Sequence, residues 1–323
     1  MLQTVFLLLL IGQAQGATVA PSPTPVTLNR VSKAKEVLAY SVQSHMRVDK
    51  RGGGLETWFP QDVDLNYDFT SNVIELKPGG VAVINYKRPV MTQSTSDSIE
   101  GPGSTDRAEV DFNYEVIVSP INEILGEKKL AKSNRLFTKN VRQSATISQN
   151  NVIGRFISEV YMLARNLGNF DSSLDFAPKL PVDDVRPGDK WKHTVGYTPQ
   201  QLEGQSGKTA VQRLDYTYGY AGVVEVDGKK VYRVTADLDM STNLADFYFQ
   251  STGEDPQTSR IHAMPIDLKT HIDFDLDMKT CETLKAVSSS SGGFSVVLSD
   301  NTEQPTLEER FKATTTMLLK SRH

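Results

Sequence analysis

The stretch LPVDDVRPGDKWKHTVGYTP, residues 180–199, holds the densest group of side chains that could do chemistry. It combines a Pro-Gly pair, several aspartates, a histidine and Trp191, one of only two tryptophans in the chain. Such residues could form a reaction centre, or they could form the turn and the anchor of a scaffold. Arg186-Pro187-Gly188-Asp189 fits a type II turn, because proline suits its second position and glycine the positive φ of its third.

A strand that follows this turn would place Trp191, His193, Val195 and Tyr197 on one face and charged residues on the other. We therefore interpret Trp191 as a packing anchor. His193 is either a hydrogen-bonded core histidine or a residue that lines a ligand site. The structural interpretation of the stretch is preferred to the catalytic one.

Acidic side chains also recur at regular spacing. His271, Asp273, Asp275 and Asp277 share one face of an alternating segment, where neighbouring side chains lie nearly 7 Å apart and do not converge. Asp237 and Asp239 would revive a metal site only if they came from the adjacent strand. In residues 62–68, DVDLNYD has the acid spacing of a calcium loop, but Tyr67 stands where that loop needs glycine. We expect solvated strand faces and no metal.

Other chemical motifs are incomplete. LEGQSGKT, residues 202–209, ends like a phosphate-binding loop, but its first position is Leu202 and no helical pattern follows. No G-x-S-x-G nucleophile motif occurs, and Cys281 has no histidine near it in the sequence. The chain is therefore predicted not to be an enzyme and to need no cofactor.

The first residues predict export. Residues 1–16 contain a short apolar run followed by Ala14-Gln15-Gly16, as in a cleavable signal peptide, and residues 17–34 form a Pro-rich linker. No cysteine follows the apolar run, so a lipid anchor is excluded. We expect a secreted or periplasmic protein with no transmembrane span in the mature chain. The single cysteine forbids an intrachain disulfide, which favours a bacterial envelope protein over an animal secreted one. A net charge of −4 argues against nucleic-acid binding.

Alternation of apolar and polar residues dominates the rest of the chain, and this is the period of a half-buried β-strand. The clearest case runs from Ala108 to Val118, and similar runs begin at Leu38, Val63, Leu214 and Ile272. Asp227-Gly228 between two such runs predicts a tight hairpin. Long antiparallel strands joined in sequence order follow from this pattern.

Residues 152–167 break the alternation with apolar residues at helical spacing. A single helix among many strands must cover a sheet face, because nothing else can bury its apolar side. The predicted fold class is mainly β (α+β): a curved antiparallel sheet or half-barrel covered by one amphipathic helix. Residues 35–323 form a single β-rich domain, with strands in 35–150, the helix at 152–167 and strands in 189–320. Trp191 is expected beside this helix.

The segment L-P-x-x-x-V-x-P-G-D-x-W, carried by Leu180, Pro181, Val185, Gly188, Asp189 and Trp191, resembles a family of uncharacterised secreted bacterial β-rich proteins. The resemblance covers about a dozen residues and implies no activity. More loosely, a curved antiparallel sheet crossed by a helix is similar to the half-barrel lipoprotein and lipid carriers of bacterial envelopes. This is an analogy of fold only.

The aromatic residues on the apolar phase of the strands suggest a function. If one helix leaves part of the sheet uncovered, this face could bind a hydrophobic ligand such as a lipid or an acyl chain. The expected lining residues are Trp191, His193, Tyr67, Phe112, Tyr114, Tyr216 and Tyr218. The alternative is a scaffold that contacts an envelope protein through sheet edges or through the basic run at Lys128, Lys129 and Lys132. A metal-assisted hydrolase is a third and weaker hypothesis.

Overall fold

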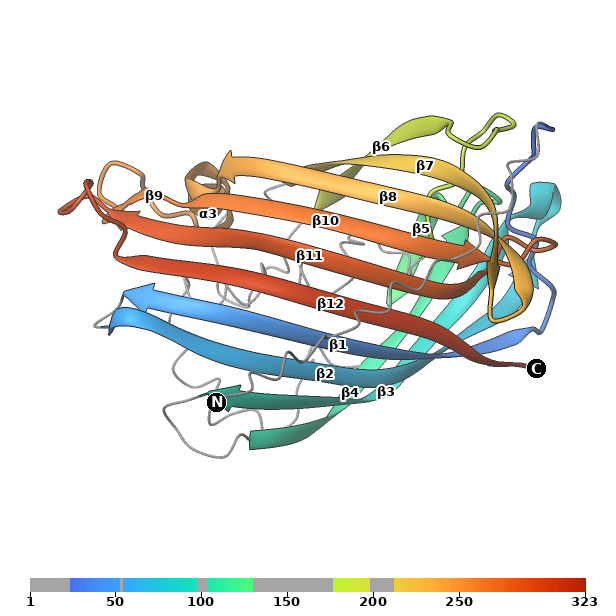
Figure 1. Cartoon of the computed structure of the whole chain (residues 1–323), viewed down its shortest axis with the longest axis horizontal. Helices are drawn as coiled ribbons and strands as arrows, with labels where there is room; N and C mark the ends of the chain where they lie inside the picture. The colour runs from blue at the N-terminus through green and yellow to red at the C-terminus, as the bar shows by residue number, and fades with distance from the viewer. Residues whose placement is uncertain (1–23, 53–54, 98–103, 130–176, 198–211) are drawn as a thin grey trace, which may run out of the picture.

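The computed structural model describes residues 24–52, 55–97, 104–129, 177–197 and 212–323, and most of them lie in one antiparallel sheet (Figure 1). A short 3-10 turn, η1 (Pro78–Gly80), joins β2 to β3, and one α-helix, α3 (Ala245–Thr252), follows β8. The strands in these ranges are β1 (Val37–Gly52), β2 (Leu55–Leu76), β3 (Ala82–Asp97), β4 (Ser104–Val118), β5 (Ile124–Lys129), β6 (Lys190–Tyr197), β7 (Gln212–Val226), β8 (Lys229–Asn243), β9 (Ile261–Ala263), β10 (Pro265–Leu276), β11 (Thr283–Leu298) and β12 (Leu307–Arg322). The prediction of a mainly β fold is confirmed.

The order of the strands joins the two ends of the chain in the middle of the sheet. Across the sheet the order is β5, β4, β3, β2, β1, β12, β11, β10, β8, β7, β6, and β9 adds a short pairing to β11. The first long strand, β1, pairs with the last, β12, in antiparallel register. The outer strands β5 and β6 do not pair with each other, so the sheet is open.

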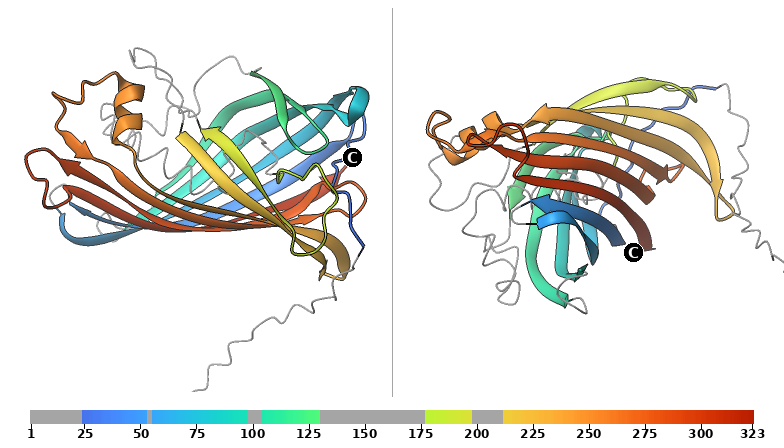
Figure 2. Two further views of the ribbon diagram at one scale, coloured as in Figure 1. Left: turned by 90° about the horizontal axis from the view of Figure 1, so that it is seen from above. Right: turned by 60° about the vertical axis from the view of Figure 1, so that its left-hand side comes forward.

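The sheet is strongly curved. Figure 2 shows the wing of β3, β4 and β5 and the wing of β7 and β6 bending to the same side of the central strands. Helix α3 lies on that side as well. The predicted curved antiparallel sheet is therefore present.

Alternation along the strands separates a buried face from a polar face. In β1, Leu38, Tyr40 and Val42 are buried, whereas Gln43, His45 and Arg47 are exposed. The buried side chains of all the central strands form one hydrophobic cluster, which also includes Tyr248 and Phe249 of α3. Since α3 lies inside the curve, the buried face is the concave one.

The helix that the sequence predicts and the helix that the structure describes are different segments. The amphipathic helix predicted at 152–167 lies outside the described residues, so its contact with Trp191 and the sheet stays a prediction. Helix α3 was not predicted, because its apolar residues Phe247, Tyr248 and Phe249 are consecutive and give no helical period. It ends at Gly253, which has a φ of +73° and donates its N–H to the Phe249 carbonyl.

Two irregular segments, residues 24–36 and 177–189, lie along one end of the sheet, and we call them the rim segments. They pair with each other at Val26 and Val185. In the first segment, the Arg30 N–H donates to the Pro120 carbonyl in the β4–β5 turn at 2.7 Å. In the second, the Leu180 N–H donates to the Ile121 carbonyl at 3.0 Å. The rim segments therefore contact the β4–β5 turn, next to one edge of the sheet.

This packing differs from the linker expected at residues 17–34. Leu28 has no exposed surface and belongs to the main hydrophobic cluster. The Val31 N–H donates to the Thr280 carbonyl in the β10–β11 turn at 2.8 Å. The proline spacing that suggested a spacer ends at Pro25, and Leu28 after it is buried, whereas Val31 is exposed.

Two turns have the conformations that the sequence predicted. Asp227 and Gly228 both have positive φ, +50° and +75°, as a two-residue hairpin between β7 and β8 requires. Gly188 has a φ of +97°, and the Asp189 N–H donates to the Arg186 carbonyl at 3.0 Å. The stretch that opened the sequence analysis is therefore the turn that begins β6.

The close approach of β11 to its neighbours predicts that Gly292→Ala destabilises the fold. A Cβ at Gly292 would lie 2.7 Å from Phe311 Cζ and would also collide with the Asp267 carbonyl oxygen. We expect a loss of about 2 kcal/mol in the free energy of unfolding, measured by urea denaturation. Gly293→Ala is the control, because its nearest atom is the Glu309 carbonyl oxygen at 3.3 Å. Equal midpoints for the two variants would contradict this account of the packing.

Candidate functional site

The convex face of the sheet pairs its acids with cations. Asp237 and Asp239 do come from the strand next to His271, as a metal site would need. However, His271 Nδ1 lies 2.7 Å from Asp237 Oδ1, and Lys269 Nζ lies 3.4 Å from Asp239 Oδ2. Partial burial works to lower the pKa of His271, but the hydrogen bond to Asp237 and the nearby carboxylates raise it overall.

The same arrangement occurs between β1 and β2, where His45 Nδ1 lies 2.8 Å from Asp64 Oδ1. Asp62 and Asp64 alternate with the buried Val63 and Leu65, as expected for a solvated strand face. Within the described ranges, no group of three or more His, Cys, Asp or Glu residues could hold a metal ion. These residues therefore give no geometric support to a metal-assisted hydrolase.

The concave face is rich in aromatic rings. Tyr40 and Phe69 stack across β1 and β2 with ring centroids 4.9 Å apart, and Tyr67 lies 6.4 Å from Phe69. Tyr216 and Tyr218 lie 6.0 Å apart along β7. All of these rings are buried and belong to the one hydrophobic cluster. A face of this kind can hold an apolar ligand or a covering layer of protein.

Four of the seven expected lining residues come together on β6 and β7. Trp191 pairs with Tyr218, and His193 pairs with Tyr216, in the register of the two strands. The rings of Trp191 and Tyr218 are stacked, with centroids 5.9 Å apart and planes 11° apart. Trp191 and His193 are partly buried, whereas Tyr216 and Tyr218 are fully buried. We call these four residues the β6–β7 cluster.

The other three expected residues lie in the opposite wing. Tyr67 is buried on β2, and Tyr114 is partly buried on β4 beside its register partner Tyr86. Phe112 belongs to β4, but its side chain lies outside the described part of the structure. The six expected residues whose side chains the structure describes therefore form two sets, one on β6 and β7 and one on β2 and β4, which are far apart in the order of the strands.

Sequence analysis missed Lys179, whose backbone contacts the β6–β7 cluster. Its backbone carbonyl accepts a hydrogen bond from Trp191 Nε1 at 2.9 Å, and its backbone also bonds to the Tyr218 hydroxyl. Its ammonium donates to the carbonyl oxygen of Asn122 in the β4–β5 turn. Lys179 thus connects the two outer regions of the sheet. A lone lysine between Pro178 and Pro181 in an apolar stretch was the available sequence signal.

Burial shifts the titration of this cluster. The Lys179 side chain is only 3% exposed, and burial lowers its pKa to about 8, although the charge of Glu123 works in the opposite direction. Burial also lowers the pKa of His193, and the Lys179 ammonium lowers it further. Two basic groups therefore lie close together beside aromatic rings.

Hydroxyl groups interrupt the apolar face in the middle of the sheet. Thr315 Oγ1 donates to Ser44 Oγ at 2.9 Å, and Thr270 and Ser290 share another hydrogen bond of 2.9 Å. Ser288 Oγ is buried and has no hydrogen-bond partner among the described residues. This oxygen could bond to a water molecule or to a polar atom of a ligand.

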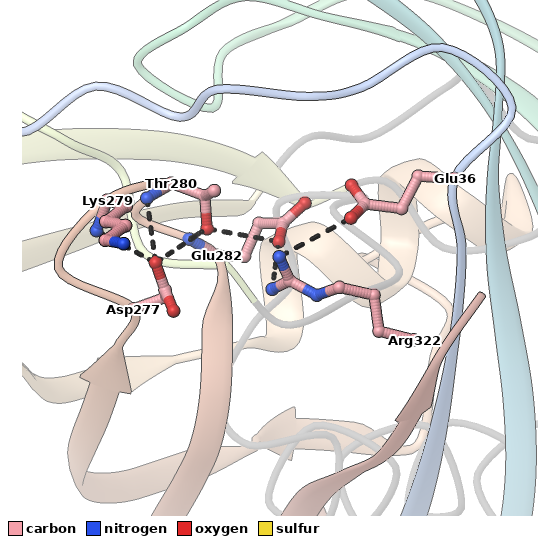
Figure 3. A network of polar contacts seen from close by, with 6 residues as sticks. All are labelled: Glu36, Asp277, Lys279, Thr280, Glu282 and Arg322. Atoms are coloured by element: carbon pink, nitrogen blue, oxygen red, sulfur yellow. Dashed lines mark hydrogen bonds and ion pairs between the residues drawn. The ribbon is translucent and has the colours of Figure 1, made fainter. Parts of the chain in front are cut away.

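Buried carboxyl groups meet at the rim, as Figure 3 shows. Arg322 lies between Glu36 and Glu282: Nη1 is 3.4 Å from Glu36 Oε1, and Nη2 donates to Glu282 Oε2 at 2.6 Å. Both glutamates are almost fully buried, and each has one carboxylate oxygen without a hydrogen-bond partner among the described residues. Asp277 and Thr280 extend the network through the Thr280 hydroxyl.

Burial raises the pKa of Glu282 to about 7, because two arginine charges, from Arg30 and Arg322, do not compensate for desolvation and for the charge of Glu36. The folded protein therefore holds a proton that the unfolded chain releases near pH 4.5. Stability contributed by this proton is present below that pH and is lost as the pH rises through about 7.

We predict that the free energy of unfolding falls by on the order of 2 kcal/mol between pH 5 and pH 8. Glu282→Gln should reduce this fall, because glutamine keeps the acceptor oxygen but cannot ionise. Urea denaturation at both pH values measures the difference. Glu308→Gln is the matched control, because Glu308 pairs with Arg51 at the other end of the strands. If the slope were the same in Glu282→Gln and in the unmodified protein, the assignment would be wrong.

We also predict that Trp191 anchors the rim to the sheet. Trp191→Ala removes the stack on Tyr218 and the hydrogen bond to Lys179, and we expect a loss of about 3 kcal/mol in the free energy of unfolding. Trp191→Phe keeps an aromatic ring but no N–H donor, so it should lose about 1 kcal/mol. An unchanged melting temperature in Trp191→Ala would refute the anchor role.

No protein-family model and no curated protein matches the sequence. Among solved structures, one on lipid–protein interactions in lipovitellin is similar to 90% of this chain, with 11% identity and a TM-score of 0.39. The chain spans about a quarter, 26%, of that lipovitellin chain. OccK5 (OpdH) of Pseudomonas aeruginosa shows 6% identity and a TM-score of 0.24, over 88% of this chain and 98% of its own.

OpdQ of the same organism gives a similar result, with 7% identity and a TM-score of 0.25, over 88% of this chain and 99% of its own. At these scores, no function is inferred from the likeness. None of the helices in the described ranges has both the length and the apolar character to span a membrane. The function proposed below therefore rests on the contacts of this chain's own residues.

Proposed function

We propose that this chain is a non-enzymatic, exported envelope protein that binds a hydrophobic ligand, a lipid or an acyl chain, on the concave face of its sheet. The observation that carries the proposal is the division of the sheet into one polar convex face and one mainly apolar, aromatic concave face. The signal peptide that the sequence predicts at residues 1–16 would place the protein in the bacterial envelope or outside the cell.

The size of the apolar face is the main support. A sheet must bury its apolar face against a second layer, and here the described elements on that side are α3 at one end and the rim segments at the other. The rings of this face have little exposed surface, so the ligand would have to lie between the sheet and the protein layer that covers it. The aromatic rings of the concave face and the open outer strands suit an extended apolar molecule.

The two tryptophans provide a test, because they lie on opposite faces. Trp191 belongs to the concave β6–β7 cluster, whereas Trp58 lies under the guanidinium groups of Arg51 and Arg310, at 4.8 and 4.3 Å, away from the buried side. Trp58→Phe and Trp191→Phe each leave one fluorescent tryptophan. A brominated fatty acid should quench Trp191 strongly and Trp58 weakly.

Equal quenching of both tryptophans would indicate non-specific adsorption. An absence of quenching, together with no lipid in organic extracts of the purified mature protein by mass spectrometry, would refute the proposal. Quenching of Trp58 alone would indicate that the ligand binds on the convex face.

The second candidate function is a scaffold that binds an envelope protein. The observation that favours it is that β5 is an outer strand and that Lys128 on it is exposed. A pull-down with the mature protein should then yield one stoichiometric partner, and substitution of Lys128, Lys129 and Lys132 by glutamine should release it. A partner retained by this triple variant would contradict contact through the basic run.

A further inference from the structure

We propose that Lys179 and His193 form the polar end of the ligand site and bind a carboxylate, so that the ligand is a free fatty acid or a similar acyl anion. This inference rests on the proposed function and adds the class of ligand. It is based on the position of one buried cation beside the aromatic part of the concave face.

Lys179 is a buried cation next to the aromatic cluster. The side chain is 3% exposed, and among the described residues no other lysine is buried. A buried ammonium is costly unless polar groups hold it in place. Its hydrogen bond to the Asn122 carbonyl and the backbone bonds of Lys179 to Trp191 and Tyr218 fix it at the edge of the aromatic cluster.

The second argument is the local balance of charge. His193 lies near enough to Lys179 for the ammonium to disfavour its protonation. The carboxylate that acts on both groups is that of Glu123, which is an exposed residue. A carboxylate bound between the two basic groups would form charge-assisted hydrogen bonds in a partly desolvated site, where such bonds are strong.

The third argument is the path for the acyl chain. His193 and Trp191 are only partly buried, so a headgroup can reach them from solvent. The stacked rings of Trp191 and Tyr218 lead to Tyr216, and from there to the rest of the buried cluster. An acyl chain that begins at Lys179 would therefore run along the aromatic concave face.

A pH dependence follows from this arrangement. Burial lowers the pKa of Lys179 to about 8, so the ammonium loses its proton within an accessible range. A bound carboxylate stabilises the charged form, and binding of the anion should therefore weaken as the pH rises above 8. Glu123 is an acidic group that acts on both bases: its charge raises the pKa of Lys179 and of His193 and so favours their charged forms, but it also repels a bound anion.

The experiment compares oleic acid with oleyl alcohol and methyl oleate, which have the same chain and no charge. Each competes with a neutral fluorescent acyl probe for the full-length mature protein at pH 7. We expect oleate to displace the probe at about tenfold lower concentration than the two neutral ligands. At pH 9.5 this preference should fall to about twofold or less, as Lys179 loses its charge.

Variants identify the residues. In Lys179→Met, oleate and oleyl alcohol should displace the probe at the same concentration as each other. Lys192→Met is the matched control, because Lys192 lies on β6 between Trp191 and His193 but is exposed on the other face. It should keep the full preference. His193→Gln should lower the preference about threefold, and it tests the site even if Lys179→Met does not fold.

The outcomes separate the two proposals. If the unmodified protein binds oleate and the neutral ligands equally well, the carboxylate site is wrong, but the apolar ligand site stands. A preference that survives in both Lys179→Met and His193→Gln would also overturn the inference. If no acyl ligand displaces the probe or binds at all, the proposed function itself fails.

Discussion

The structure depends on the antiparallel pairing of β1 with β12. This contact joins the strands that begin the described fold to those that end it, from Leu38 against Arg322 to Gly52 against Leu307. Without it, the chain would form two separate meanders, each with an exposed central edge. The pairing closes a loop of almost the whole domain, and its entropic cost must be offset by long strands with a common apolar face. The ion pair of Arg322 with Glu36 lies at one end of the same contact.

Once this pairing is made, the alternation of side chains divides the sheet into two environments. On the convex side, aspartates pair with histidines and lysines, and these side chains are exposed to solvent. The concave side carries one cluster of aromatic and aliphatic residues that extends from β4 to β7. Curvature brings the two wings to the same side of the central strands, so that the apolar residues line the inside of the curve. The ligand proposed above would lie on this concave face.

At the rim, buried ionisable groups lie next to the apolar interior. The rim segments hold the β4–β5 turn and the β10–β11 turn, and the buried ionisable groups Glu36, Glu282, Arg30 and Lys179 gather around them. Such groups cost free energy when buried, and each is held by hydrogen bonds or by charges of opposite sign. The rim thus stabilises one end of the sheet and also supplies the cations that could recognise an anion.

Alternation predicted the strands around Leu38, Val63, Ala108, Leu214 and Ile272 and their buried phase, and the Pro-Gly and Asp-Gly pairs predicted two turns, because these signals act over a few neighbouring residues. It also led to the grouping of Trp191, His193, Tyr216 and Tyr218 as candidates, since each lies on the apolar phase of its strand. The pairing of β1 with β12, the burial of Leu28, Arg30 and Glu36, and the position of Lys179 became known only from the tertiary structure. Helix α3 belongs to the same class, because its consecutive aromatic residues have no period until the sheet supplies a surface to cover. These features depend on contacts between residues far apart in the chain. A local sequence pattern does not indicate which distant residue pairs with a buried charge, or which distant strand pairs with a given strand.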